Sequence, residues 1–267
     1  GKSVLLQEFV RYLQQQPEAI NIVMINLQEL EFDQLLEYYA LHQYILDHHK
    51  EGMTNVLIID EVQLCPSFEL AINSIYAKQI YDIYITGSNA FLLSSDLATL
   101  FTGRTVEVKV YPFSFKEYLL YHGITDGFDR AFDEYVRSGG MPGSYPYKSE
   151  DRRYAYIQDV YETVLVRDLV DKYHIRNQQE FVNIAEFMMD NIGNLLSANN
   201  ISTALNHNDS DITRKTVAKY IDYLENAFLF YEAKRYDLKG KKYLARNSKY
   251  YLCDAAFRYA VNGTRNM

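Results

Sequence analysis

Tryptophan is absent from this chain of 267 residues, cysteine occurs only twice, and no apolar run approaches the length of a membrane span. A spanning helix needs about 20 consecutive apolar residues, so we expect no membrane partner. The first residues also lack the charged and then apolar layout of a signal peptide. Cys65 and Cys253 are far apart and stand among ordinary core residues, so we expect reduced, structural thiols and a cytoplasmic location.

Internal repeats and low-complexity tracts are absent as well, and the composition is that of a globular protein. Hydrophobic residues make up 48% of the chain and charged residues 23%, which excludes an intrinsically disordered protein. The length is enough for one large domain or two ordinary ones.

The net charge of −8 is unevenly distributed. Residues 1–120 carry 7 Lys and Arg against 15 Asp and Glu, whereas residues 121–267 carry 20 of each. Within the second part, residues 212–250 hold 10 basic and 4 acidic residues. An acidic front half and a basic segment near the end indicate two different tasks on one chain.

The first 110 residues alternate between helical periodicity and short apolar runs. The periodicity predicts helices over 4–16, 33–50 and 68–79. The apolar runs predict buried strands over 20–27, 55–60 and 81–88, and a fourth strand over 105–110. Apolar strands that alternate with helices indicate a parallel sheet covered on both faces, which is the three-layer α/β plan.

After Tyr111-Pro112 the pattern changes to helices, predicted over 114–123, 128–140, 151–173 and 178–192, with the Gly- and Pro-rich stretch GGMPGSYPY at 139–147. From about residue 197, a short helix, a turn, a second helix and two strand-like runs (228–236 and 248–254) are typical of a winged helix-turn-helix. We therefore expect three parts: a core over 1–120, a helical region over 121–176 and a winged-helix domain over 177–267.

The tripeptide Gly1-Lys2-Ser3 leads directly into the first predicted helix, like the last three residues of the phosphate-binding motif G-x-x-x-x-G-K-[ST]. Alone it is weak, because it occurs by chance in about a few per cent of chains of this length. However, VLIIDE ends in Asp60 and Glu61, and the third strand ends in Thr86-Gly87-Ser88-Asn89. In a parallel sheet these ends meet at the edge where ligands bind, so the order predicts a nucleotide site.

The acidic half-chain cannot hold an anionic triphosphate by general attraction, so binding has to be local. We expect backbone N–H groups at Gly1 and the helix start to bind phosphates, with Lys2 reaching the β and γ phosphates. Ser3 and Asp60 are the candidate ligands of Mg²⁺. Lys2 and Asp60 should therefore face each other across a gap sized for a metal-bound polyphosphate.

Glu61 is the candidate for polarising the attacking water, and Ser88 and Asn89 for hydrogen bonds to the γ phosphate or to that water. The alternative for the acidic pair is a helix cap or a solvated strand end. Arg104 precedes the predicted fourth strand. It either completes a charge clamp, in its own site or in that of a neighbouring copy, or is a surface arginine beside a turn glycine.

Together, GKS with its helix, LIIDEVQ, ITGSNAFLL, FTGRTVEVKVYPFSFKEYL, GGMPGSY, VRDLVDKYHIRN and TVAKYIDYLENAFLFYEAKRY closely resemble the prokaryotic AAA-type ATPases of the AAA+ superfamily that carry a C-terminal domain of unknown function. The resemblance covers nearly the whole chain, and residues 112–118 are its most specific segment. It implies a P-loop NTPase sheet, ATP and Mg²⁺ as cofactors, and a first-sensor position at Ser88 and Asn89. It also implies nucleotide-site roles for Lys2, Ser3, Asp60 and Glu61.

Members of that family have a strand and a Gly-rich loop before the position of Gly1, and many have a nuclease-like domain after the winged helix. We therefore expect the sequence to be part of a longer chain. Without the upstream loop, half of the phosphate-binding site would be absent and ATP affinity would collapse.

The basic segment supports a second hypothesis. Within residues 213–227, helical spacing turns Val217, Tyr220, Ile221 and Leu224 inward and leaves Arg214, Lys215 and Lys219 outward. Such residues of a recognition helix contact double-stranded DNA in the major groove, and the KGKK turn with Lys241 and Lys242 would contact phosphates as a wing. The alternative is a lid or protein-docking module whose lysines only solvate a turn.

Two functions of different class follow. In the first, the chain is an ATP hydrolase whose cycle moves the C-terminal winged-helix region. In the second, it is a nucleic-acid- or protein-binding module in which nucleotide only shapes the fold. Glu61 favours the first, because binding alone does not need it. A homo-oligomer or a protein partner is compatible with both.

His48, His49 and His174 lack partners at metal spacing and are assigned to helix ends or packing.

Overall fold

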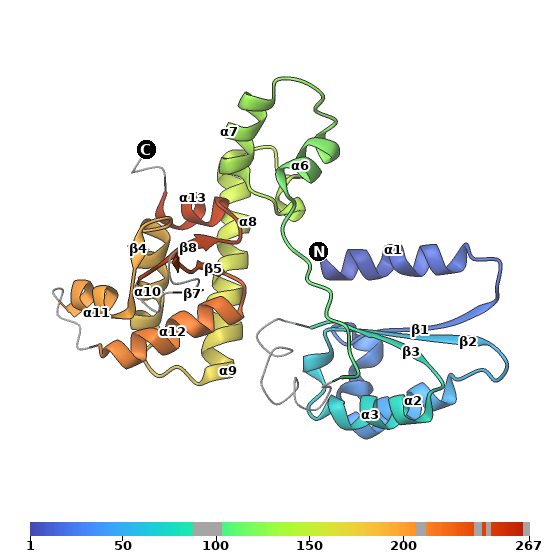
Figure 1. The fold of residues 1–267 in the computed structure, drawn as a ribbon. Coiled ribbons are helices and arrows are strands. Elements are labelled where there is room, and N and C mark those ends of the chain that lie inside the picture. The colour runs from blue at the N-terminus through green and yellow to red at the C-terminus, as the bar shows by residue number, and fades with distance from the viewer. Residues whose placement is uncertain (88–102, 207–211, 238–241, 244–246, 264–267) are drawn as a thin grey trace. The chain divides into compact units, whose positions relative to one another are not determined.

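The computed structural model describes residues 1–87, 103–206, 212–237, 242–243 and 247–263. The chain divides into two compact units, Gly1–Val110 and Tyr111–Met267, which are described separately below (Figure 1). Among the described helices, none has the length and apolar character needed to cross a bilayer.

Unit 1 is built on a parallel sheet. Its strands are β1 (Ile20–Asn26), β2 (Thr54–Asp60) and β3 (Asp82–Ile85), in the order β1-β2-β3. The register pairs Asn26 with Asp60 and Ile59 with Ile85, so the carboxyl ends of all three strands share one edge. The central strand β2 is buried at every position after Thr54. The predicted parallel α/β arrangement is therefore confirmed.

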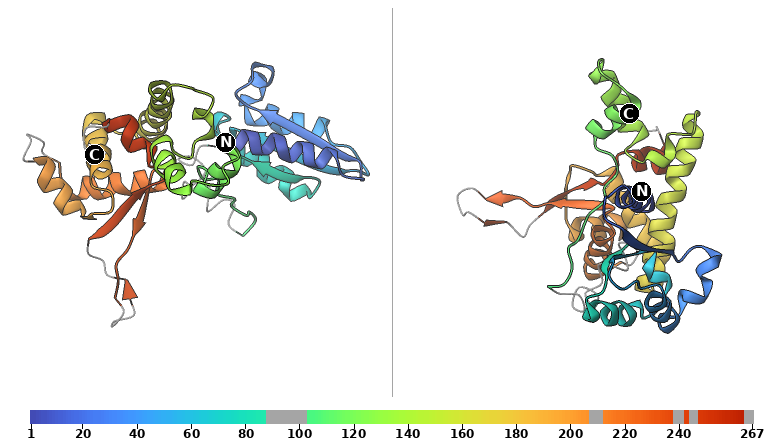
Figure 2. Two further views of the ribbon diagram at one scale, coloured as in Figure 1. Left: turned by 90° about the horizontal axis from the view of Figure 1, so that it is seen from above. Right: turned by 90° about the vertical axis from the view of Figure 1, so that its right-hand side faces the viewer.

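Helices cover both faces of this sheet. Helix α1 (Lys2–Gln14) lies over one face, and η1 (Leu30–Leu36), α2 (Tyr38–Asp47) and α3 (Phe68–Lys78) lie over the other (Figures 1 and 2). Every second residue of β1 and β2 points toward α2 and α3, which is why one core forms between them, with members such as Val23, Ile25, Leu57, Ile59, Ile45 and Ile75. On the other face, the ring of Phe9 in α1 lies 4.7 Å from that of Tyr84.

Two predicted elements of unit 1 differ from the structure. The expected helix over 33–50 is divided at Glu37, whose carboxylate caps α2 by accepting the N–H groups of Tyr39 and Ala40. The expected fourth strand over 105–110 was wrong, because these residues form no strand and Val106 and Val108 are 91% and 80% exposed. Alternating residues bury a face only when the backbone pairs with a neighbouring strand, and the described part of the sheet ends at β3.

Unit 2 begins with helices close to where periodicity predicts them. These are α6 (Phe115–His122), α7 (Phe128–Ser138), η3 (Pro142–Ser144), α8 (Glu150–Glu162), η4 (Thr163–Val170), α9 (Asp171–Tyr173) and α10 (Gln178–Asp190). The expected helix over 151–173 is thus a run of α8, the π-helical η4 and α9. The break between the units lies at Val110–Tyr111, so residues 111–120, which we assigned to the first domain, pack within unit 2.

The rest of unit 2 combines helices with short antiparallel strands. In chain order these are β4 (Leu195–Leu196), α11 (Ala198–Asn206), α12 (Arg214–Asn226), β5 (Phe230–Ala233), β6 (Tyr236–Asp237), β7 (Lys242–Tyr243), β8 (Ser248–Leu252) and α13 (Ala256–Asn262). The sheet order is β4-β8-β5, and β6 pairs with β7 as a separate ladder.

The Gly-Gly step of GGMPGSYPY joins distant parts of unit 2. The N–H group of Gly140 donates to Asp254 Oδ2 at 2.8 Å, and Ala256 N donates to Asp254 Oδ1 at 2.9 Å. A Cβ on Gly139 would lie 2.4 Å from Asp254 Oδ1, so glycine is required there for close approach. This contact explains the glycine pair without any role in ligand binding.

Glu61 has an unusual backbone conformation at the turn between β2 and η2 (Val62–Leu64). Its φ of 57° and ψ of 43° lie in the left-handed region, which costs residues with a Cβ about 1–2 kcal/mol. Backbone hydrogen bonds on either side hold this turn against β3: Val62 N donates to Thr86 O, and Thr86 N to Ile59 O, both at 2.9 Å.

We expect Glu61→Gly to be more stable than Glu61→Ala by about 1 kcal/mol, because glycine adopts a positive φ without the Cβ clash. Thermal unfolding midpoints of the two variants measure the difference. As a control, Glu8 lies within α1, where Glu8→Gly should be less stable than Glu8→Ala. The same order at Glu61 as at Glu8 would contradict the left-handed conformation.

Glu225 in α12 has a perturbed carboxyl group. Burial, together with the carboxylates of Glu232 and Asp222, raises the pKa of Glu225 to about 7, while Lys234 and the N–H group of Glu232 act in the opposite direction. Because the folded-state pKa lies above the unfolded value, the proton on Glu225 stabilises the fold fully below about pH 4.5. This contribution is lost as the pH rises to about 7.

We expect Glu225→Gln to raise the unfolding midpoint of unit 2 at pH 8 and to change it little near pH 4.5, because glutamine mimics the protonated acid. The difference at pH 8 should be about 1 kcal/mol for this half-buried group, read from thermal unfolding across the pH range. Glu162→Gln, at an exposed position of α8, is the control. Equal profiles for Glu225→Gln and the wild type would contradict the prediction.

Candidate functional site

The carboxyl edge of the unit 1 sheet gathers polar groups from β2 and β3. Asp60 ends β2 and is 1% exposed, and Thr86 follows β3. The Thr86 hydroxyl donates to Asp60 Oδ1, and its own oxygen, Thr86 Oγ1, accepts the N–H group of Glu61 at 3.4 Å. The buried carboxylate of Asp60 is thus hydrogen-bonded to the next strand.

Lys2 comes to the same edge from the start of α1. Its Nζ donates to the backbone oxygen of Gly87, the residue after Thr86. Lys2 and Asp60 therefore contact two adjacent residues, although 58 positions separate them in the sequence. The lysine and the acidic residue thus lie at the same edge of the sheet, and their roles toward phosphate and metal stay predictions.

Glu61 projects from the strained turn beside Asp60, and its side chain is half-buried. Gln63 Nε2 donates to Glu61 Oε2, which links the carboxylate to η2. The other amide atom, Gln63 Oε1, is buried without a hydrogen-bond partner among the residues that the structure describes.

The remaining predicted nucleotide-site residues have different positions. Gly1 is the N-cap of α1, and Ser3 lies in its first turn beside Lys2. Ser88 and Asn89 lie outside the described residues. The guanidinium of Arg104 lies 5.9 Å from the ring centroid of Tyr76, near the C-terminal end of α3. That end of α3 leads to the start of β3, which is the end of the strand opposite the carboxyl edge. The contact therefore favours a surface role for Arg104 in its own copy. A role of Arg104 toward the site of a neighbouring copy stays a prediction.

The donor set at this edge suits a metal-bound polyphosphate. An ammonium group and the first turn of a helix attract phosphate oxygens. Hydroxyl and carboxylate oxygens, as on Ser3 and Asp60, are ligands that Mg²⁺ prefers. Glu61, the next residue along the chain, carries a second carboxylate group.

The basic residues of α12 divide into two sets. The apolar face of this helix is buried as predicted, with Val217, Tyr220, Ile221 and Leu224. Arg214 and Lys215 are exposed in the first turn of α12, which follows the N-cap Thr213. Lys219 is also exposed, but its Nζ lies 5.5 Å from the ring centroid of Tyr223, one turn further along. That ring in turn stacks on Tyr173 at 3.5 Å. Lys242 belongs to β7, and Lys241 lies outside the described residues.

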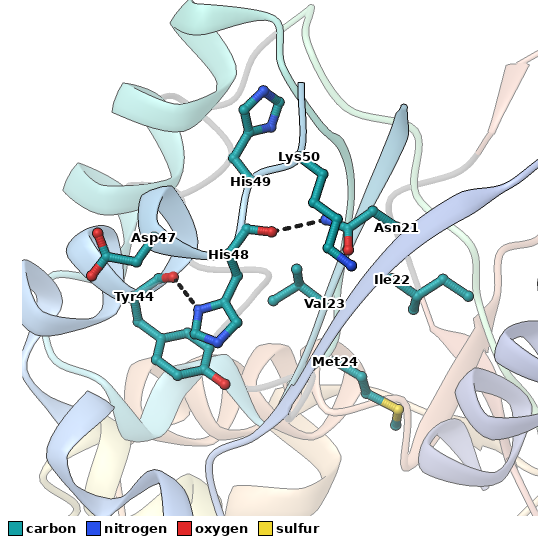
Figure 3. Close-up of a pocket in the computed structure, with 9 residues that line it drawn as sticks. All are labelled: Asn21, Ile22, Val23, Met24, Tyr44, Asp47, His48, His49 and Lys50. Carbon is teal, nitrogen blue, oxygen red and sulfur yellow. Dashed lines mark hydrogen bonds between the residues drawn. The ribbon is translucent and has the colours of Figure 1, made fainter. Parts of the chain in front are cut away.

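A separate pocket of about 400 Å³ opens at the other end of the sheet, where β1 begins and α2 ends (Figure 3). Asn21 Nδ2 donates to His48 O at 2.8 Å, and His48 Nδ1 lies 2.8 Å from Tyr44 O (Figure 3). The ring of His48 stacks on Tyr44 at 3.9 Å, while that of His49 meets Tyr81 edge-on at 5.5 Å. These contacts agree with helix-end and packing roles for both histidines.

Two residues at the carboxyl edge were missed from the sequence. Thr86 was noted only as one of several small polar residues after the third strand, and no pattern marked its hydroxyl as the partner of Asp60. Gln63 follows Glu61 by two positions in LIIDEVQ, and its contact with Glu61 depends on the turn into η2.

Comparison with known families divides the chain in a similar way. Residues 1–119 match the family described as AAA domain, and residues 129–267 match the family described as Domain of unknown function (DUF8612). The AAA match thus extends nine residues beyond the compact unit that ends at Val110.

Two relatives match most of the chain or nearly all of it. An uncharacterized protein of Haemophilus influenzae is 35% identical over an alignment of 270 positions, which covers 99% of this chain and 67% of the relative. An uncharacterized protein of Methanocaldococcus jannaschii is 23% identical over 223 residues, 80% of this chain and 50% of the relative. The chain thus spans about two thirds of the first relative and half of the second.

A solved structure shares the fold over both units. The Walker-type ATPase Paby2304 of Pyrococcus abyssi aligns with 98% of this chain and 88% of its own, with a TM-score of 0.61 and 15% sequence identity. The parallel sheet, the match to the AAA domain family and the solved structure all indicate an AAA-type ATPase fold. This fold suggests nucleotide binding. The chain belongs to the family defined by the DUF8612 domain, here preceded by an AAA domain.

Proposed function

We propose that the protein binds ATP with Mg²⁺ at the carboxyl edge of the unit 1 sheet and hydrolyses it. The observation that carries this proposal is the convergence of Lys2, Thr86 and Asp60. A cation at a helix start and a buried carboxylate at a strand end contact two adjacent residues. If Asp60 only capped a helix or ended a solvated strand, Lys2 would not need to lie at the same edge of the sheet.

Each residue has a role that follows from its chemistry. Lys2 and the N–H groups of the first turn of α1 would bind the phosphates, and Ser3 and Asp60 would supply oxygen ligands to the metal. The metal, when bound, neutralises charge that develops on the phosphate oxygens. Glu61 would polarise the attacking water, and Ser88 and Asn89 stay candidates for the γ phosphate. We also propose that hydrolysis is coupled to movement of the C-terminal region. A cytoplasmic location and a homo-oligomer or protein partner are part of the same proposal.

Glu61→Gln should lower ATP turnover by at least about 100-fold, because the amide cannot accept a proton from water. ATP binding should change little, since the variant keeps the size and hydrogen-bonding capacity of the side chain. Steady-state phosphate release and equilibrium nucleotide binding, measured on the full-length protein, separate the two effects.

The control is Glu51→Gln, an exposed glutamate before β2, at the opposite end of the same strand. It should leave turnover unchanged. Wild-type turnover by Glu61→Gln would rule out Glu61 as the catalytic base, and a wild-type protein that binds no ATP would contradict the whole proposal.

A second candidate function is DNA contact by residues 177–267. The order α10, β4, α11, α12, β5, β8, with the β6–β7 ladder between the last two strands, supports a winged helix. Arg214 and Lys215 stand exposed at the start of α12, where a recognition helix contacts DNA. Lys219 is directed along the helix toward Tyr223, so it is the weaker candidate. A lid or a protein-docking module is the alternative.

Arg214→Ala combined with Lys215→Ala should weaken binding of a fluorescent DNA duplex and lower the slope of log affinity against log salt by about 2, because two phosphate contacts are lost. Fluorescence anisotropy at several salt concentrations measures both quantities. Arg130→Ala with Arg137→Ala removes the same charge from exposed positions of α7 and should have no effect. Equal slopes for both double variants would remove the DNA hypothesis for α12.

A further inference from the structure

Thr86 makes more contacts with the end of β2 than its position after β3 requires. Its backbone N–H group donates to Ile59 O and its backbone oxygen accepts from Val62 N, both at 2.9 Å. Any residue would make these two bonds. The contacts of its hydroxyl group with Asp60 Oδ1 and with the N–H group of Glu61 at 3.4 Å need a serine or threonine.

The hydroxyl therefore acts on both acidic residues at once. A carboxylate group rotates easily about the terminal carbon–carbon bond of its side chain. A hydrogen bond donated to one oxygen restricts this rotation and so fixes the direction in which the other oxygen points. Glu61 follows directly, in a left-handed conformation that persists only when its surroundings hold it. Through the Glu61 N–H group, Thr86 also bonds the backbone of that strained residue.

Thr86 is also next to Gly87, whose oxygen accepts Lys2 Nζ. The two-residue step Thr86-Gly87 is thus the place where the start of α1, the end of β2 and the turn into η2 meet. The backbone of Thr86 alone is enough to extend the pairing of β3, so the bond from its hydroxyl to the carboxylate of Asp60 is an additional contact.

We propose that Thr86 is a positioning residue of the ATPase site: its hydroxyl orients the carboxylate of Asp60 for the metal and holds the turn that presents Glu61. This inference rests on the proposed function and assigns Thr86 a role toward Mg²⁺ and water through Asp60 and Glu61, without contact to the nucleotide. A partner of this kind, which orients a metal ligand, typically changes metal affinity or activity by about 10–100-fold when removed.

The test compares Thr86→Val, which keeps the shape and β-branching but removes the hydroxyl, with Thr86→Ser, which keeps the hydroxyl. Thr86→Val should lower kcat by about 10–100-fold and raise the Mg²⁺ concentration for half-maximal turnover several-fold, with KM for ATP within about threefold of wild type. Thr86→Ser should stay within about threefold of wild type on all three measures. Thr54→Val, at the exposed start of β2, is the matched control for the loss of a hydroxyl.

A second readout does not depend on turnover. Binding of ATP is titrated with and without Mg²⁺. Thr86→Val should keep the metal-free affinity and lose most of the gain that Mg²⁺ provides, whereas Thr86→Ser should keep both. Unfolding midpoints are compared first, and Thr86→Ala, with the same expected results, replaces Thr86→Val if the latter does not fold.

The outcomes separate this inference from the proposed function. If wild type binds and hydrolyses ATP while Thr86→Val has the same kcat and Mg²⁺ dependence, the inference alone is overturned. If Thr86→Ser is as impaired as Thr86→Val, the methyl packing and not the hydroxyl matters, and the inference also fails. If wild type neither binds nor hydrolyses ATP, both proposals fall together.

Discussion

Parallel pairing of β2 with β3 is the constraint on which the candidate site depends. Because Ile59 pairs with Ile85, the residues that follow the two strands emerge at the same edge in the same order. Thr86 N then bonds Ile59 O, and Val62 N bonds Thr86 O, which continues the ladder beyond the strands into the turn. A shift of one residue would turn Asp60 to the opposite face of the sheet.

The charge distribution of the chain agrees with local recognition at this edge. Residues 1–120 carry a net charge of −8, which repels a polyphosphate at long range, so its binding depends on groups within contact distance. Lys2 and the first turn of α1 are such groups. The basic residues of α12 lie in the other unit, where exposed Arg214 and Lys215 provide a field of the opposite sign. The two halves thus differ in charge, as the two proposals require.

Backbone strain and hydrogen bonding are concentrated at the same point of unit 1. Glu61 has a left-handed conformation directly after a strand that is buried at six consecutive positions. The rigid strand on one side and the bonds from Thr86 on the other hold this conformation. Strain of this kind persists where the surrounding structure determines the conformation, and here it presents a carboxylate beside a buried acidic residue.

By itself, the sequence determined the alternation of helices and strands and the parallel sheet, because burial periodicity reports these directly. Its Gly1-Lys2-Ser3 tripeptide and the polar ends of its strands placed Lys2 and Asp60 at one edge. It did not determine the hydroxyl of Thr86 as the partner of Asp60, the contact of Gln63 with Glu61, or the position of Arg104 beside Tyr76. It also predicted a strand over 105–110 that the structure lacks. Hydrogen bonds and strand pairing need a specific neighbour in space, and only the tertiary structure decides which neighbour each residue has.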